Sequence, residues 1–87
     1  MNYLHKRVYI GPGQHVIVEH NIPCNIVLLD QLNYTRYQNG EEFRYHGGFF
    51  NTNPAELWPP KSGQWNVVAD LGGRTGSLAA TVSVVND

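Results

Sequence analysis

The sequence predicts a small all-β domain that folds as an antiparallel β-sandwich. The chain has 87 residues, which is the size of one domain, so residues 1–87 are expected to form a single unit. Val, Ile, Thr and aromatic side chains, which favour strands, are frequent, whereas Ala is rare. Nine glycines and five prolines help to separate short apolar runs at intervals of roughly 8–12 residues, a spacing typical of sandwiches and barrels.

The first two expected strands flank a glycine- and proline-rich turn. Residues 3–10 and 14–20 surround Gly11-Pro12-Gly13, which predicts a hairpin with Leu4 opposite His20. The apolar side chains of both strands then share one face, as alternation across a strand requires. Lys6 falls on that apolar face, so its amine has to reach an edge of the sheet.

The middle of the chain predicts one buried strand and one further hairpin. Residues 24–29 are apolar except for Asn25, which suits a central strand covered on both faces. Residues 30–33 are expected to form a turn or a single helical turn. Asn39-Gly40 is a residue pair favoured in two-residue hairpin turns, and it would set Tyr34 opposite Tyr45.

The last expected hairpin follows two shorter strands. Gly47-Gly48 suggests a bulge or a sharp bend, and residues 49–50 and 55–58 are short strand candidates. Residues 64–71 and 77–85 form the final hairpin, whose register places Trp65 opposite Val82 in the core.

Charge and cysteine content limit the partners and the compartment. Six Lys and Arg against seven Asp and Glu give a net charge of −1, so no nucleic-acid partner is expected. The longest apolar run, residues 26–29, is far shorter than the roughly 20 residues of a membrane helix, so no membrane partner is expected either. The lone Cys24 excludes an intrachain disulfide, and residues 1–7 lack the apolar core of a signal peptide. These features predict a cytoplasmic protein.

The sequence offers little support for catalytic or metal chemistry. His15 and Glu19 share a strand face but would lie about 13 Å apart, and His20 would point to the other face. One metal ion cannot bridge that distance, so no metal or other cofactor is expected. Cys24 opens the most apolar run of the chain, which predicts a buried and inert thiol, and we expect no catalytic residues.

Aromatic side chains are concentrated between residues 34 and 58. Beside Arg and Asn they could form a stacking platform for a sugar, a nucleotide or a peptide, or they could fill a core or a dimer interface. The residues selected for binding a ligand or partner are Tyr34, Arg36, Tyr37, Tyr45, His46, Trp58 and Arg74.

The glycine-rich segment 72–76 supports a second hypothesis. Together with Asp70, Arg74 and His46 it could serve a small-ligand sensor or an enzyme, because glycine loops present backbone N–H groups to anions. The segment lacks the Lys-Ser/Thr and the helix of a P-loop, so a plain hairpin loop is the competing interpretation.

Four stretches of the sequence are distinctive in order and spacing: residues 26–30, 33–40, 45–48 and 62–73. They resemble an uncharacterised bacterial family, domain-of-unknown-function family 1883. This resemblance covers nearly the whole chain and implies a small β-sandwich in which one sheet is bent at bulges, similar to a β-prism. It further implies relatives that occur alone or fused to Toll/interleukin-receptor-type modules, and hence a sensing or interaction role. Gln64 departs from a His common in the family.

These observations predict a non-catalytic bacterial interaction module. The aromatic hairpin around residues 34–45 would face a ligand, a partner protein or a second copy of the chain. Self-association is expected because a thin core gains stability from an added interface. A structural subunit of a larger complex is a third interpretation.

Overall fold

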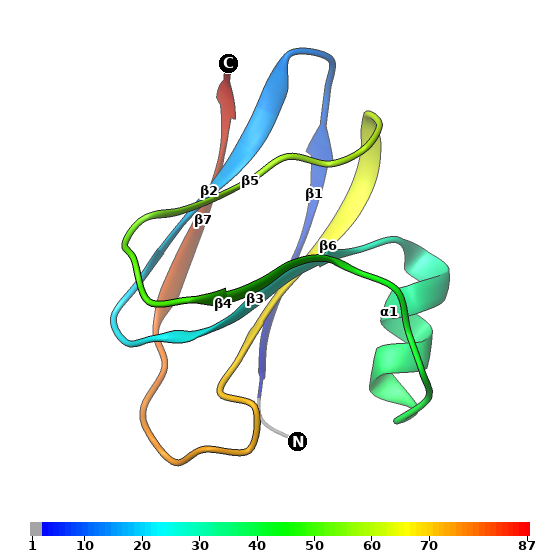
Figure 1. Cartoon of the computed structure of the whole chain (residues 1–87). Helices are drawn as coiled ribbons and strands as arrows, with labels where there is room; N and C mark the ends of the chain where they lie inside the picture. Colours follow the sequence, from blue (N-terminus) through cyan, green and yellow to red (C-terminus); the bar gives the residue numbers. More distant parts are fainter. Residues whose placement is uncertain (1–2) are drawn as a thin grey trace.

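The computed structural model describes residues 3–87 as two packed antiparallel sheets and one helix (Figure 1). The four-stranded sheet has the order β1-β6-β3-β4, and the three-stranded sheet has the order β5-β2-β7. This architecture confirms the predicted all-β sandwich. The elements are β1 (Tyr3–Ile10), β2 (Gln14–His20), β3 (Cys24–Leu29), α1 (Gln31–Gln38), β4 (His46–Phe50), β5 (Ala55–Leu57), β6 (Gly63–Asp70) and β7 (Ala80–Asn86).

The main core lies between the two sheets. Val16 and Val18 of β2 face Ile26 and Leu28 of β3, and all four side chains are fully buried. Cys24 and Trp65 belong to the same cluster, which confirms their predicted place in the core. A second, smaller cluster lies on the opposite face of the four-stranded sheet, under α1.

The first predicted hairpin is wrong, although both strands exist with the predicted bounds. β1 pairs with β6, and β2 pairs with β5 and β7, so Gly11-Pro12-Gly13 carries the chain from one sheet to the other. Alternation required only that Val8 and Val16 share one core. Strands facing each other across a sandwich satisfy that requirement as well as neighbouring strands do.

The last predicted hairpin is wrong for the same reason. β6 pairs with β1 and β3, whereas β7 pairs with β2 in the other sheet. Trp65 therefore lies opposite Val8, and Val82 lies opposite Val18. Both side chains face the interior as predicted, but they approach it from different sheets.

The predicted hairpin around Asn39-Gly40 is replaced by helix α1. The Asp30 side chain caps the helix by accepting a hydrogen bond from Asn33 N at 2.8 Å. Asn39 is the C-cap, and Gly40 follows it with a φ of 73°. An Asn-Gly pair suits a helix end as well as a hairpin, because both need a residue with positive φ. Tyr34 and Tyr37, three residues apart, then share the helix face that packs on the sheet.

Strand β4 depends on glycine for its close approach to β3. Gly47 has a φ of 129°, and a Cβ built on it would lie 2.3 Å from the Ile26 carbonyl oxygen. The register with β3 nevertheless runs continuously from Phe50 to His46. Gly47 therefore lets β4 lie close beside β3 at the edge of the sheet.

Candidate functional site

A row of four residues crosses the outer face of the four-stranded sheet. Tyr3, Asp70, Asn25 and Phe49 are direct partners in neighbouring strands β1, β6, β3 and β4. Because directly opposite residues share a face, all four lie on the side that carries α1. Figure 1 shows the helix on this side, away from β2 and β7.

The Asp70 carboxylate joins three separate elements. Its Oδ1 accepts hydrogen bonds from Asn25 Nδ2 at 3.0 Å and from Gly72 N at 2.9 Å. Its Oδ2 accepts one from the Tyr37 hydroxyl at 2.7 Å. Burial, and then the bond to Asp70, raise the pKa of Tyr37, so the phenol stays protonated and acts as the donor. Asp70 thus holds the helix and the β6–β7 loop against the sheet.

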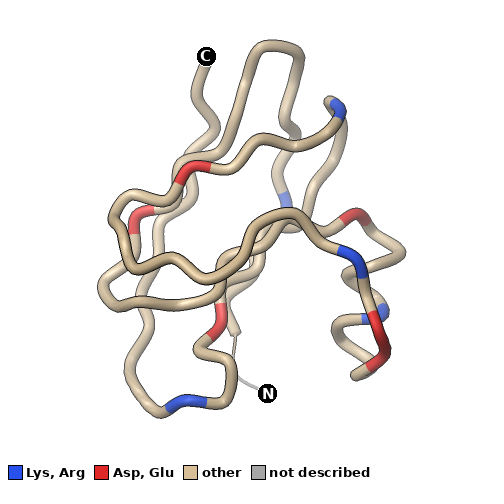
Figure 2. The backbone as a smooth tube through the Cα atoms, viewed as in Figure 1, with Lys and Arg blue, Asp and Glu red and all other residues tan. Residues whose placement is uncertain are grey.

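Arg74 belongs to the loop between β6 and β7, and its side chain lies over the same surface. Its guanidinium carbon is 4.8 Å from the centre of the Phe49 ring, and its Nε donates to the Leu71 carbonyl at 3.0 Å. Within residues 3–87 no carboxylate lies within ion-pair distance of this guanidinium. The two ion pairs among these residues are both formed by His15. Arg74 is also the one charged position of residues 71–79, as Figure 2 shows. Its charge therefore stays available to a ligand.

Aromatic rings continue the surface along β4 and the segment before it. The Phe43 ring packs edge-on against Tyr37, with ring centroids 5.2 Å apart, and lies tilted beside Tyr45, with ring centroids 5.7 Å apart. Tyr45 and Phe49 remain 51% and 52% exposed. A cavity of about 210 Å³ lies between Tyr37, Phe43, Tyr45 and Asp70. We call Tyr37, Phe43, Tyr45, Phe49, Asp70 and Arg74 the aromatic site.

Three of the seven sequence-predicted residues belong to the aromatic site. Tyr37 and Tyr45 line its cavity together with Asp70 from the second hypothesis, whereas Arg74 joins the site through the Phe49 ring. Tyr34 lies buried beside it, stacked on His5 at 4.2 Å and hydrogen-bonded to the Tyr3 hydroxyl at 3.2 Å. Burial, followed by that bond, raises the pKa of Tyr34 to about 12.

The other three predicted residues lie apart from the site core. Arg36 is exposed on α1 and lines a shallow hollow with Arg44 and Tyr45, at the border of the aromatic site. His46 packs edge-on against Trp65 at 5.8 Å, and its register position places it on the opposite sheet face from Asp70. Trp58 follows β5 in the other sheet and stacks on His15 at 4.4 Å.

The surroundings of the Cys24 thiol agree with the predicted burial of this side chain. Cys24 is buried, and burial raises its pKa. Its sulfur lies 3.8 Å from His20 Nδ1, but that nitrogen is already 2.8 Å from the Ile22 carbonyl. His20 Nε2 contacts the Thr52 carbonyl at 2.6 Å, so the imidazole anchors backbone and does not activate the thiol.

A family model described as "Domain of unknown function (DUF1883)" matches residues 1–87, the whole chain. The chain belongs to this family. The match confirms the resemblance seen in the sequence. No curated protein matches the chain, and no solved structure matches it. Within residues 3–87, no helix of this DUF1883 domain is long and apolar enough to cross a membrane.

Sequence reasoning missed Asn25, Phe43 and Phe49 as members or neighbours of the DUF1883 aromatic site. Asn25 carried a usable signal, because it is the lone polar residue in the apolar run of β3. A polar side chain in a buried strand needs a partner, and Asp70 supplies it. The positions of Phe43 and Phe49 depend on β4 pairing with β3, which no local pattern indicates.

Proposed function

We propose that this domain is a non-catalytic binding module whose aromatic site recognises a peptide segment of a partner protein. The segment would present a carboxylate next to an apolar side chain. One observation carries the proposal: Arg74 lies on the exposed Phe49 ring with no carboxylate partner in residues 3–87. A guanidinium held over a ring can still donate N–H groups to a carboxylate.

The neighbouring rings provide the apolar half of the recognition surface. Tyr45 and Phe49 each expose about half of their area, and Tyr45 and Phe43 line the cavity of the site. Aromatic and arginine side chains supply much of the binding energy of protein interfaces, and the aromatic ones bury a large area for few rotatable bonds. Glycines 72, 73 and 76 shape the loop that brings Arg74 to this surface.

The hydrogen bonds of Asp70 favour binding over catalysis. Three protein donors already occupy most of the about four lone-pair positions of the Asp70 carboxylate, and the raised pKa of Tyr37 keeps that phenol neutral. A general base needs a free lone pair directed at the substrate. His46, the base considered in the enzyme hypothesis, lies on the other face of the sheet and about three positions along it.

We further propose that the module works in the cytoplasm of a bacterial cell. The free and buried thiol of Cys24 supports a reducing compartment, where a single unpaired cysteine is common. Charges of both signs are interspersed along the chain (Figure 2), which supports a protein partner over a nucleic acid.

The test is an NMR titration of the ¹⁵N-labelled domain with 3-phenylpropionate, which joins a carboxylate to a ring. We expect millimolar binding with amide shifts at Gly72, Arg74 and Phe49, and weaker shifts with 3-phenylpropanamide, which lacks the charge. Arg74→Ala should reduce the affinity at least about fivefold. Tyr9→Ala is the control, because Tyr9 is about as exposed as Phe49 but lies at the end of β1 away from Tyr3 and Asp70.

Shifts that persist unchanged in Arg74→Ala, or none at about 10 mM ligand, would contradict the proposal. Light scattering of the wild type and Phe49→Ala provides a second arm. A dimer that dissociates in Phe49→Ala would show that the aromatic site recognises a second copy of the chain, and the partner-protein part of the proposal would then be wrong.

A further inference from the structure

A seam between the two sheets runs along the side of the molecule formed by β1 and β7. These strands are edges of different sheets and are not hydrogen-bonded to each other. Between them opens a cavity of about 310 Å³. Its main lining residues are Leu4, Lys6, Val18, Val67, Ala69 and Val82, which we call the edge seam.

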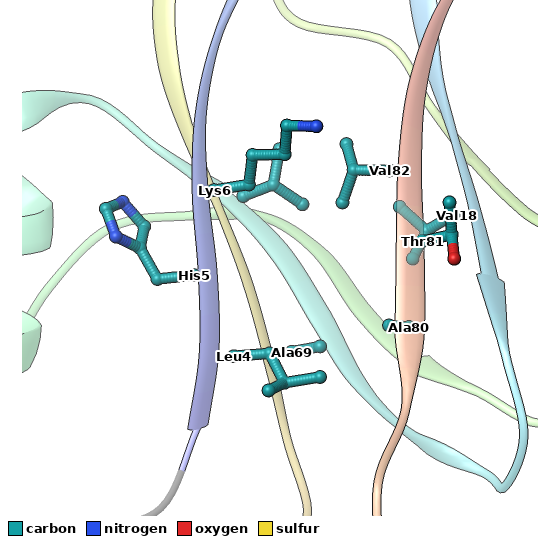
Figure 3. A pocket seen from close by; sticks show the side chains of 9 residues that line it. Leu4, His5, Lys6, Val18, Ala69, Ala80, Thr81 and Val82 are labelled. Carbon is teal, nitrogen blue, oxygen red and sulfur yellow. The ribbon is translucent and has the colours of Figure 1, made fainter.

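The floor of the edge seam is part of the main core. Val18 and Val67 are buried between the sheets, at 0% and 2% exposure, yet they line the cavity. Leu4 at the mouth is 39% exposed. Figure 3 shows Leu4 and Lys6 projecting from β1 toward β7, whereas His5 projects to the opposite side. The apolar interior is therefore open along one edge of the sandwich.

Lys6 places a positive charge at this opening. In Figure 3 its amine extends over the seam toward Val82. Within residues 3–87 no carboxylate lies within ion-pair distance of it, since both ion pairs belong to His15. Arg7 follows on the outer face, and β1 contains no acidic residue. The free edge of β1 is thus positively charged on both of its faces.

We propose that the edge seam accepts an extended segment of a partner protein that pairs with β1 and carries an acidic side chain facing Lys6. A strand with one unpaired side offers a row of N–H and C=O groups to such a segment. Every second side chain of the added strand enters the seam, and the carboxylate meets the Lys6 amine there. The site is separate from the aromatic site and does not depend on it.

Charge disfavours the simplest alternative occupant, β1 of a second copy. Antiparallel pairing of two β1 strands about their centre places Lys6 and Arg7 of one chain beside the same residues of the other. Like charges at directly opposite positions destabilise a strand pair. The competing explanation for Lys6 is that an inward charge only protects the edge against unwanted pairing.

The test uses two acetylated, amidated octapeptides of alternating Val and Thr, with either Glu or Lys replacing one central Val. Each is titrated into the ¹⁵N-labelled domain, and amide shifts of β1 are followed. We expect the Glu peptide to bind about tenfold more tightly than the Lys peptide. In Lys6→Glu the preference should reverse, and in the neutral Lys6→Met it should disappear.

A third peptide, N-methylated on alternate residues to block strand pairing, should bind at least about tenfold more weakly. If neither octapeptide shifts β1 amides at about 5 mM, or if both bind equally, the proposal is overturned and Lys6 serves as edge protection. Amides of Gly72 and Phe49 report on the aromatic site in the same spectra, so failure of one proposal is distinguishable from failure of the other.

Discussion

Replacing Gly47 with alanine should destabilise the domain strongly, because β4 approaches β3 too closely for a side chain. At a φ of 129° an alanine costs about 1–3 kcal/mol in backbone strain. Its Cβ would also lie 2.3 Å from the Ile26 carbonyl oxygen and 3.0 Å from a Leu57 methyl. Relief of the overlap moves β4 away from β3 and weakens flanking ladder bonds worth about 1 kcal/mol each.

The expected total is about 3–5 kcal/mol, a large share of the roughly 4–13 kcal/mol that stabilises a domain of this length. The melting temperature should fall by at least about 12 °C. Urea unfolding followed by the fluorescence of buried Trp65 measures the loss. Because β4 carries Phe49, the amide signals of the aromatic site should shift as well.

Gly48→Ala is the matched control for this prediction. Gly48 also has a positive φ, 159°, but no heavy atom lies within 4 Å of a Cβ built there. We expect it to lose about 1 kcal/mol from backbone strain alone. Equal losses in the two variants, or a loss below about 1 kcal/mol in Gly47→Ala, would refute the argument from close approach.

Two further predictions concern a histidine and a helix cap. The bond from His15 to Glu56 (2.9 Å), partly opposed by burial and aided by Asp87, raises the pKa of His15 above 6.5. The stabilisation from this pKa shift is complete below the ordinary pKa of histidine and is lost as the pH rises through the raised pKa. The free energy of unfolding in urea should therefore decline between about pH 5.5 and 8.5, and His15→Gln should remove this decline. Asp30→Ala should lower the free energy of unfolding by about 1 kcal/mol, because the Asp30 side chain caps α1 by accepting a hydrogen bond from Asn33 N. The control is Glu19→Ala at an exposed position, which should change the free energy of unfolding by less than about 0.5 kcal/mol. A pH slope that survives in His15→Gln, or an Asp30→Ala variant as stable as the control, would contradict the respective argument.

Strand positions were predictable because they depend on local patterns. The bounds of β1, β2 and β3 match the sequence prediction, since alternating or continuous apolar residues and adjacent glycine or proline mark a strand directly. Burial of Trp65 and Cys24 was predictable for the same reason. Helix α1 was missed because its eight residues include a Thr and two Tyr, which favour strands, and because Asn39-Gly40 suits two kinds of turn.

The candidate site was predictable in composition but not in geometry. Tyr37, Tyr45 and Arg74 were selected because aromatic and arginine residues recognise ligands. Tyr37 and Tyr45 do line one cavity, and Arg74 lies over Phe49 of β4. Trp58 and His46 were selected on the same grounds and lie elsewhere. Residue type and nearness in sequence carry no information on which sheet, or which face, a strand will join.

By itself the sequence determined the class of the fold, the burial of Cys24 and Trp65 and the absence of an intrachain disulfide. Those properties follow from side-chain chemistry and from the two-residue period of a strand, which act within a few residues. Tertiary structure alone decided which strands pair, and with that decision it placed Arg74 on Phe49 and left β1 with a free edge. Two sheets that share one core bury the same side chains in several pairing orders, so the choice rests on long-range packing that no local pattern encodes.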